Sequence, residues 1–82
     1  MQVVEVGEKI KVGAVFEDER VTPKWFFWGR TKHELKSVEH RWRARSGEAA
    51  LMYFSATDGA NVFELQFNLK TAEWFLEKIY TA

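Results

Sequence analysis

The stretch HRWRARSG, residues 40 to 47, carries the side chains of this chain that are best suited to bind a ligand. Arg41, Arg43 and Arg45 recur at every second position, a spacing that places side chains on one face of a β-strand. A row of guanidinium groups binds the phosphates of a nucleic acid or the carboxylates of an acidic protein. It is also typical of an ordinary solvated strand, on which arginine stems cover apolar neighbours. Which face of the sheet these arginine side chains occupy therefore decides between a binding site and an ordinary solvated strand.

Residues suited to catalysis or metal binding are scarce. The chain has no cysteine and two histidines, His33 and His40, and it has neither a glycine-rich phosphate loop nor a serine nucleophile motif. His33 and its neighbour Glu34 point to opposite faces of a strand, so they cannot act together there. Two histidines on different strands also lack a third ligand for zinc. We therefore predict that the protein is not an enzyme and has no catalytic residue, no cofactor and no metal site.

Length and composition indicate a single domain over residues 1–82. Aromatic residues make up 16% of the chain, and burial must stabilise the fold because no disulfide is available. No apolar run approaches the roughly 20 residues that span a membrane. The first residues also lack the basic-then-apolar order of a signal peptide. We expect a cytoplasmic protein that does not bind membranes.

Charge is balanced overall but unevenly distributed along the chain. The formal net charge is zero, which argues against a strongly basic nucleic-acid binder. Residues 20 to 45 carry eight basic and two acidic side chains, whereas the rest of the chain carries four basic and ten acidic ones. If the first group forms one patch in space, it creates an oriented field, but a short chain also segregates charge by chance.

The sequence TDGAN predicts a β-hairpin. Asp58 and Gly59 suit the two central positions of a tight turn, and alternating apolar runs flank them. In that register Thr57 pairs with Ala60, and six side chains share the core face of the two strands. These side chains are Ala50, Met52, Phe54, Phe63, Leu65 and Phe67.

The turn before this hairpin decides where the arginine row points. A two-residue turn at Ser46-Gly47 would put Arg41 and Arg43 on the core face, where unpaired guanidinium groups are costly. A three-residue loop over residues 46–48 reverses the parity of the strand. We therefore predict that the arginines lie outside, beside Tyr53. The inward-facing residues of this strand would then be Val38, His40, Trp42 and Ala44.

A further hairpin is expected in PKWFFWGRTKHEL, residues 23–35. Gly29-Arg30 suits a two-residue turn with glycine first. That register places Phe26, Trp28, His33 and Leu35 on one face, and Trp25, Phe27, Lys32 and Glu34 on the other. The amino-terminal segment adds a strand around Ile10 and Val12, with a bulge at Gly13.

The carboxy-terminal segment AEWFLEKIY predicts an α-helix. Thr71 is suited to cap its start, and Glu73 lies favourably in the first turn. One apolar stripe at helical spacing comprises Ala72, Phe75, Leu76, Ile79 and Tyr80. We therefore expect an α+β fold, in which a twisted antiparallel sheet of about five strands is covered on one face by this helix.

Four segments together resemble a bacterial family of small domains of unknown function. They are VTPKWFFWGR, SVEHRWR, ATDGANVFELQFN and AEWFLEKIY, which extend over most of residues 10–80. The residues that carry the resemblance are Pro23, Phe26, Trp28, Gly29, Arg30, Val38, Trp42, Arg43, Gly59, Glu64, Leu65, Trp74 and Leu76. Some members of that family are associated with translesion DNA polymerases, so the resemblance implies a link with nucleic-acid work. It implies no catalytic residue.

These observations favour a non-enzymatic binding module that works through the outer face of its sheet. The candidate binding face comprises Arg41, Arg43, Arg45, Tyr53, Lys32 and Trp25. Arginine together with tyrosine and tryptophan is typical of protein interfaces, so a protein partner or a homodimer is the preferred interpretation. Single-stranded DNA or RNA is the alternative, because basic side chains beside aromatic ones also bind unpaired bases.

Overall fold

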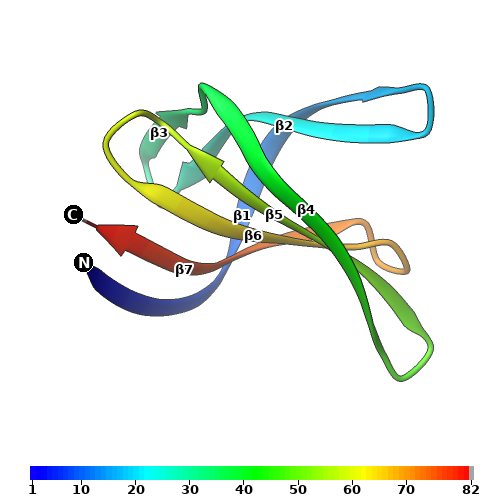
Figure 1. Cartoon of the computed structure of the whole chain (residues 1–82). Helices are drawn as coiled ribbons and strands as arrows, with labels where there is room; N and C mark the ends of the chain where they lie inside the picture. Colours follow the sequence, from blue (N-terminus) through cyan, green and yellow to red (C-terminus); the bar gives the residue numbers. More distant parts are fainter. Residues whose placement is uncertain (82) are drawn as a thin grey trace.

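The computed structural model describes residues 1–81, which form seven β-strands and no helix. The strands are β1 (Gln2–Glu17), β2 (Arg20–Trp28), β3 (Thr31–Glu34), β4 (Ser37–Ser46), β5 (Ala49–Thr57), β6 (Val62–Asn68) and β7 (Glu73–Thr81). They make one antiparallel sheet in the order β3-β2-β1-β7-β6-β5-β4 (Figure 1). The prediction of an α+β fold with five strands is therefore wrong, and the described chain is all-β.

The predicted carboxy-terminal helix is strand β7, and a β-bulge explains the error. Leu76 pairs with Leu65 and Lys78 with Glu64, so Glu77 is an extra residue on β7. Trp74, Leu76 and Ile79 are buried, and the extra residue lengthens the second interval from two positions to three. An interrupted strand alternation thus imitates the spacing of an amphipathic helix.

The predicted helix cap at Thr71 belongs to the turn between β6 and β7. Ala72 adopts a left-handed φ of 60°, and its N–H donates to the carbonyl of Asn68 at 2.7 Å. The side-chain oxygen of Asn68 accepts the N–H groups of Lys70 and Thr71. This closed turn returns the chain antiparallel to β6, so that β7 fills the place between β6 and β1.

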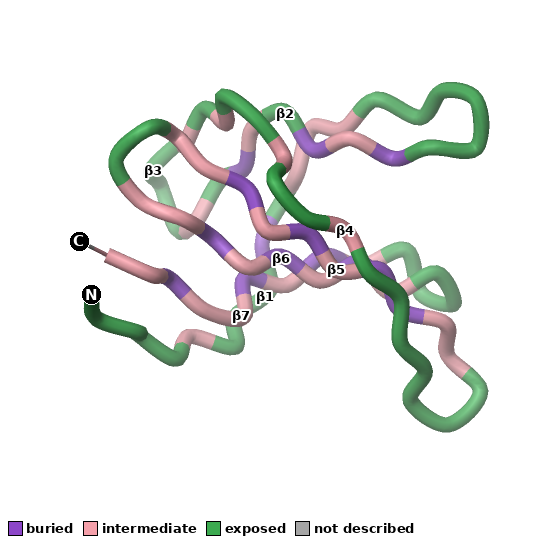
Figure 2. Tube along the Cα trace, in the orientation of Figure 1, coloured by how far each residue is buried: buried purple, intermediate pink, exposed green. Residues whose placement is uncertain are grey.

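Strand β1 bends the sheet over onto itself. Its first part, up to Ile10, pairs with β7, whereas its second part, from Lys11 onward, pairs with β2. The two ends of the strand order therefore approach each other, and a hydrogen bond from Arg41 on β4 to Thr22 on β2 links them. The concave inner face encloses the core, and the buried stretches lie in the middle of the strands (Figure 2). The largest fully buried side chains are Pro23, Phe26, Phe54, Phe63, Leu65 and Leu76.

The hairpin between β2 and β3 confirms its predicted register. Trp28 pairs with Thr31 around Gly29-Arg30, and Gly29 has a φ of 63°. A bulge is present beside Gly13 as predicted, but its extra residue is Lys24 on β2, because Gly13 pairs with Trp25 and Ala14 with Pro23. A Cβ at Gly13 would overlap the indole of Trp25, so glycine is required there by close packing.

The hairpin between β5 and β6 has the predicted core face but not the predicted pairing. Thr57 pairs with Val62, not with Ala60, so the loop has four residues and not two. The carboxylate of Asp58 accepts the N–H groups of Ala60 and Asn61, both at 2.8 Å, and this stabilises the longer loop. Because the register error is an even number of positions, the inward set of side chains was still predicted correctly.

Candidate functional site

The arginine row faces the opposite way from the prediction. The turn before β5 consists of Gly47 and Glu48, because Ser46 pairs with Ala49, and Gly47 has a φ of 60°. In this register Arg41 is opposite Phe54, Arg43 opposite Met52 and Arg45 opposite Ala50. The three arginines therefore lie on the inner face, and the predicted outward orientation is wrong.

The inner position of the arginines does not bury them, because β4 is the last strand of the sheet. Arg43 and Arg45 are exposed, and Arg41 is half-buried. The guanidinium carbon of Arg41 lies 5.8 Å from the centre of the Phe54 ring, and its Nη2 donates to Thr22 Oγ1 at 3.0 Å. Apolar stems thus cover the rim of the core while the charged groups reach its edge, and the expected desolvation cost is largely avoided.

The guanidinium of Arg41 is only partly satisfied by hydrogen bonds. Its Nε is buried and has no hydrogen-bond partner among the described residues. Burial and then the nearby charge of Arg20 lower the pKa of Arg41 from its ordinary value. An arginine keeps its proton even so, which leaves a charged donor with unused hydrogen-bonding capacity at the core edge.

A wedge separates β4 from the first half of β2. We use the name wedge for the space between the residues that line it, which are Glu19, Arg20, Val21, Arg41, Trp42, Arg43 and Met52. The β1–β2 and β4–β5 hairpins diverge toward their tips (Figure 1). It contains a hollow of about 220 Å³, next to a second hollow of about 320 Å³ that reaches Phe16 and Leu69.

The opposite lip of the wedge is acidic. The turn between β1 and β2 carries Glu17, Asp18 and Glu19, which line the second hollow together with Arg20 and Arg43. Asp18 and Glu19 both have positive φ values, 50° and 62°, so this tight turn is built without glycine. The wedge therefore has a basic lip on β4 and an acidic lip at the β1–β2 turn.

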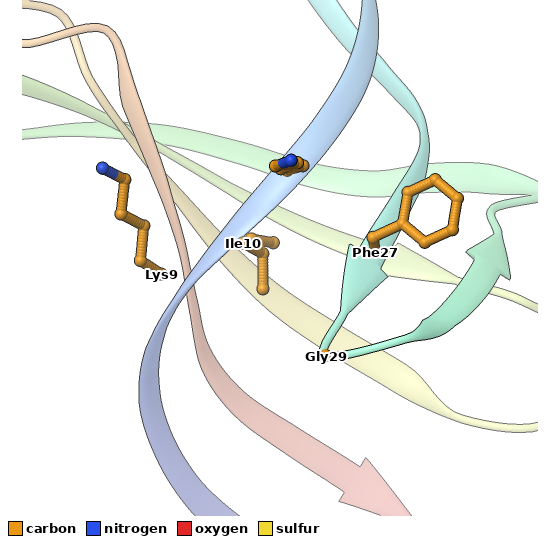
Figure 3. A pocket seen from close by; sticks show the side chains of 5 residues that line it. Lys9, Ile10, Phe27 and Gly29 are labelled. Carbon is orange, nitrogen blue, oxygen red and sulfur yellow. The ribbon is translucent and has the colours of Figure 1, made fainter.

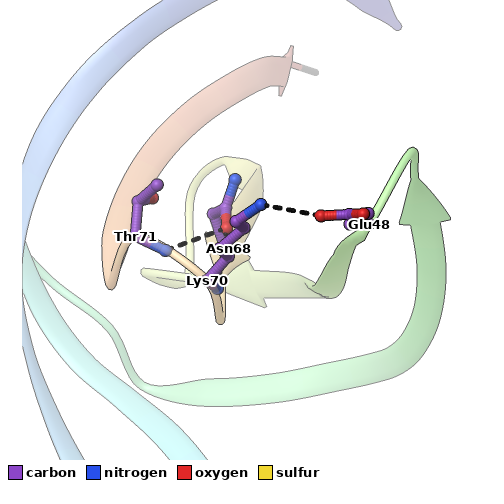
Figure 4. Close-up of polar contacts among 4 residues, drawn as sticks. All are labelled: Glu48, Asn68, Lys70 and Thr71. Carbon is purple, nitrogen blue, oxygen red and sulfur yellow. Dashed lines mark hydrogen bonds and ion pairs between the residues drawn. The ribbon is translucent and has the colours of Figure 1, made fainter.

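Three lysines of the described chain have acidic partners, whereas the arginines have none. Ion pairs in the described chain join Lys9 to Glu73, Lys32 to Glu34 and Lys70 to Glu48. Figure 4 shows the last of these pairs beside the Asn68 turn, with Lys70 Nζ 3.3 Å from Glu48 Oε2. Within residues 1–81, none of the following arginines forms an ion pair: Arg20, Arg30, Arg41, Arg43 and Arg45.

Tyr53 lies on the outer face, away from the arginines. It stacks on Trp42, with ring centroids 5.3 Å apart and an angle of 6° between the planes. Its hydroxyl accepts a hydrogen bond from Gln66 Nε2 at 3.0 Å, and Gln66 also donates to Glu77. Trp42 is 41% exposed, so the prediction that it lies in the core is wrong.

The remaining two candidates, Lys32 and Trp25, lie together on the β2–β3 hairpin. Lys32 Nζ is 5.1 Å from the centre of the Trp25 ring. A shallow hollow of about 560 Å³, lined by Lys9, Ile10, Lys11, Phe27 and Gly29, opens where β1 passes beside this hairpin (Figure 3). The six predicted face residues therefore occupy three separate places: the inner side of β4, the outer side of β5, and the β2–β3 hairpin.

The two histidines lie in different surroundings. His33 stacks on Phe26 with centroids 4.7 Å apart, and it also contacts Phe63. His40 is exposed and pairs with Ser55 beyond a bulge in β4, so its predicted core position is wrong. Val38, before the bulge, packs against the core as predicted. Among residues 1–81 no cluster of three or more potential metal ligands occurs.

Comparison of the chain with protein-family models, curated proteins and solved structures finds no match. The resemblance drawn from the sequence therefore stays a prediction. The part of the chain that the structure describes contains no helix that could cross a membrane.

Proposed function

We propose that this chain is a non-enzymatic binding module that recognises an acidic protein segment through β4. The observation that carries the proposal is the row Arg41, Arg43 and Arg45 on an edge strand, without acidic partners in the described chain. The buried, unpartnered Nε of Arg41 supports it, because an unsatisfied charged donor favours a ligand that brings a carboxylate.

A homodimer formed by pairing two β4 edges is disfavoured by charge. A two-fold axis would place the arginine row of one copy against the same row of the other. Like charges at opposed strand positions destabilise such a pair. Charged side chains on an edge strand also prevent aggregation, and the row serves that purpose in any case. The partner that fits β4 best is therefore a different chain with acidic side chains.

Single-stranded nucleic acid is the second candidate function, and the exposed Trp42 favours it. One face of its indole stacks on Tyr53, which leaves an aromatic surface close to the arginine row. The acidic lip of Glu17, Asp18 and Glu19 opposes a polyphosphate, and so does the formal net charge of zero. An acidic protein segment is repelled less by these carboxylates than a polyphosphate is. Its own carboxylates can occupy only the positions next to the arginines of β4, whereas a polyphosphate is charged along its whole length.

A direct binding experiment separates the two candidates. A fluorescent peptide rich in glutamate and a fluorescent fifteen-nucleotide oligothymidine are titrated with the protein at low salt, and anisotropy is measured. The proposal expects the peptide to bind and Arg43→Glu to weaken binding, whereas Arg30→Glu, an equal charge change in the β2–β3 turn, leaves it unaltered. Binding of the oligonucleotide alone, with loss in Trp42→Ala, would establish the second candidate instead.

A cytoplasmic location is part of the proposal. The chain has no cysteine, so its stability does not depend on an oxidising compartment. Localisation of a tagged chain in its source cells tests this point, and export from the cytoplasm would contradict it.

A further inference from the structure

We infer that the acidic partner binds as an added β-strand along the free edge of β4, inside the wedge. This inference rests on the proposed function and specifies its geometry. Strand β4 ends the sheet order and pairs only with β5 among the described strands. The free edge thus offers unpaired backbone groups, which another extended segment can use.

The hairpin register identifies the free backbone groups. In a hairpin with a two-residue turn, the residues that flank the turn exchange both backbone hydrogen bonds, and the pattern then alternates. Ser46 and Ala49 flank the turn, so Ala44 and Trp42 also bond to β5. The N–H and C=O groups of Arg41, Arg43 and Arg45 therefore point away from β5. The residues that offer the arginine side chains are the same ones that offer the free backbone.

This coincidence specifies the sequence of the partner. Residues of an added strand that lie opposite the arginines share the inner face with them, where a carboxylate can meet each guanidinium. The intervening residues lie on the outer face, beside Trp42 and Ala44, where apolar side chains fit. The partner is thus a short segment in which acidic and apolar residues alternate.

The wedge can accept such a segment only at the end near the β4–β5 turn. The hydrogen bond from Arg41 to Thr22 joins β4 to β2 and blocks a strand that would continue past it. Toward Ser46 the two hairpins diverge, and the hollows beside Arg43 and Met52 are open. Residues 41–46 span about 20 Å at the rise of a β-strand, which suits a partner segment of about six residues.

The test uses a labelled seven-residue peptide in which three glutamates alternate with two valines between terminal serines. Arg43→Glu should weaken its binding about tenfold or more, whereas Arg30→Glu should not change it. A peptide with lysine in place of glutamate should bind Arg43→Glu better than it binds the original protein. Circular dichroism of both variants verifies that they remain folded.

Two measurements report the added strand itself. Amide hydrogen exchange should slow on peptide binding at Arg43 and Arg45, but not at Trp42 and Ala44, whose amides already bond to β5. Peptides N-methylated only at the glutamates or only at the valines should differ strongly. The glutamate set should lose binding if the added strand is antiparallel, and the valine set should lose it if the strand is parallel.

The possible outcomes separate the inference from the proposed function. The peptide could bind in a charge-dependent way while amide exchange stays unchanged and the two methylated peptides behave alike. That result would overturn the added strand but would agree with the proposed binding module. Absence of peptide binding at low salt overturns both, and Arg43-dependent binding of oligothymidine alone assigns the arginine row to nucleic acid.

Discussion

Side chains that point to the inner face are buried in the middle of the sheet but exposed at its β4 edge. On β6 and β7 the inward residues Leu65 and Leu76 are fully buried, and strands pair with both sides of each. On β4 the inward residues include Arg43 and Arg45, which are exposed. The difference shows that the face of a sheet becomes core only where other strands curve around to cover it. Position in the strand order decides whether an inward side chain stabilises the fold or is available to a ligand.

The largest difference between the two regions should appear in the free energy of unfolding. Leu76→Ala removes a fully buried side chain at the centre and should lower that free energy by about 3 kcal/mol. Arg45→Ala, at an inward position of the edge, should change it by less than about 0.5 kcal/mol. Urea denaturation followed by circular dichroism measures both. Similar losses in the two variants would mean that the edge contributes to the core as much as the centre does.

A second substitution tests the bend that brings the two ends of the sheet together. Gly13→Ala places a Cβ where the indole of Trp25 lies, so β1 or the indole must shift. We expect a loss of about 2 kcal/mol, the usual size for an overpacked site. Gly47→Ala is the matched control, because a Cβ there has open space and only the left-handed φ is unfavourable. Thermal denaturation of both variants checks the order, and a larger loss in Gly47→Ala would contradict this account of the bend.

A smaller change in stability, which depends on pH, should distinguish the loop between β5 and β6 from the turn between β4 and β5. Hydrogen bonds from backbone N–H groups, first that of Asn61, lower the pKa of Asp58. The folded pKa therefore lies below the unfolded value of about 3.9. The stabilisation from this carboxylate is fully present above that value and is lost as pH falls through the folded pKa. The turn at Gly47-Glu48 lacks this arrangement in the described chain, where Glu48 contacts Lys70 instead.

Melting temperatures measured between pH 5 and pH 2 test this difference. The original protein should lose more stability over that range than Asp58→Asn, in which an amide oxygen can still accept the two N–H groups but does not titrate. Glu48→Gln, in the edge turn, should retain the pH dependence of the original protein. Parallel curves for the original protein and Asp58→Asn would exclude the carboxylate as the cause.

A substitution at Arg41 should separate its effect on stability from its effect on binding. Arg41→Met keeps an apolar stem over Phe54 and removes the buried, unpartnered Nε, together with the hydrogen bond from Nη2 to Thr22. The unpartnered Nε carries a desolvation cost, and its removal offsets the loss of the hydrogen bond to Thr22. We expect the free energy of unfolding to stay equal or to rise by up to about 1 kcal/mol, while the acidic peptide binds more weakly. Denaturation and anisotropy on the same sample check both, and a marked loss of stability would assign Arg41 to the fold.

Local turn chemistry made part of this fold predictable from the sequence. Gly29-Arg30 specified the register of the β2–β3 hairpin, because glycine at the first turn position fits the observed φ. The alternation around Asp58 specified the core face of β5 and β6, although side-chain bonds in the loop shifted the pairing by two positions. Such features depend on neighbours in the chain, so the sequence alone contains them.

The errors share a different physical origin, which is the position of a strand among the others. The bulge at Glu77 made β7 imitate a helix, and only its place between β6 and β1 shows that it is a strand. The arginine row was assigned outward on the assumption that every inward position is buried. That assumption fails for the last strand of a curved sheet.

The sequence by itself thus determined the β2–β3 turn, the inward side chains of β5 and β6, and the alternation of arginines along residues 41–45. The tertiary structure alone decided that this row faces inward, that Trp42 stacks on Tyr53 outside, and that the wedge leaves the edge of β4 open. The physical reason is that alternation depends on neighbouring residues, whereas burial depends on which distant strands cover a face. Sequence patterns report the first directly and the second only through the completed fold.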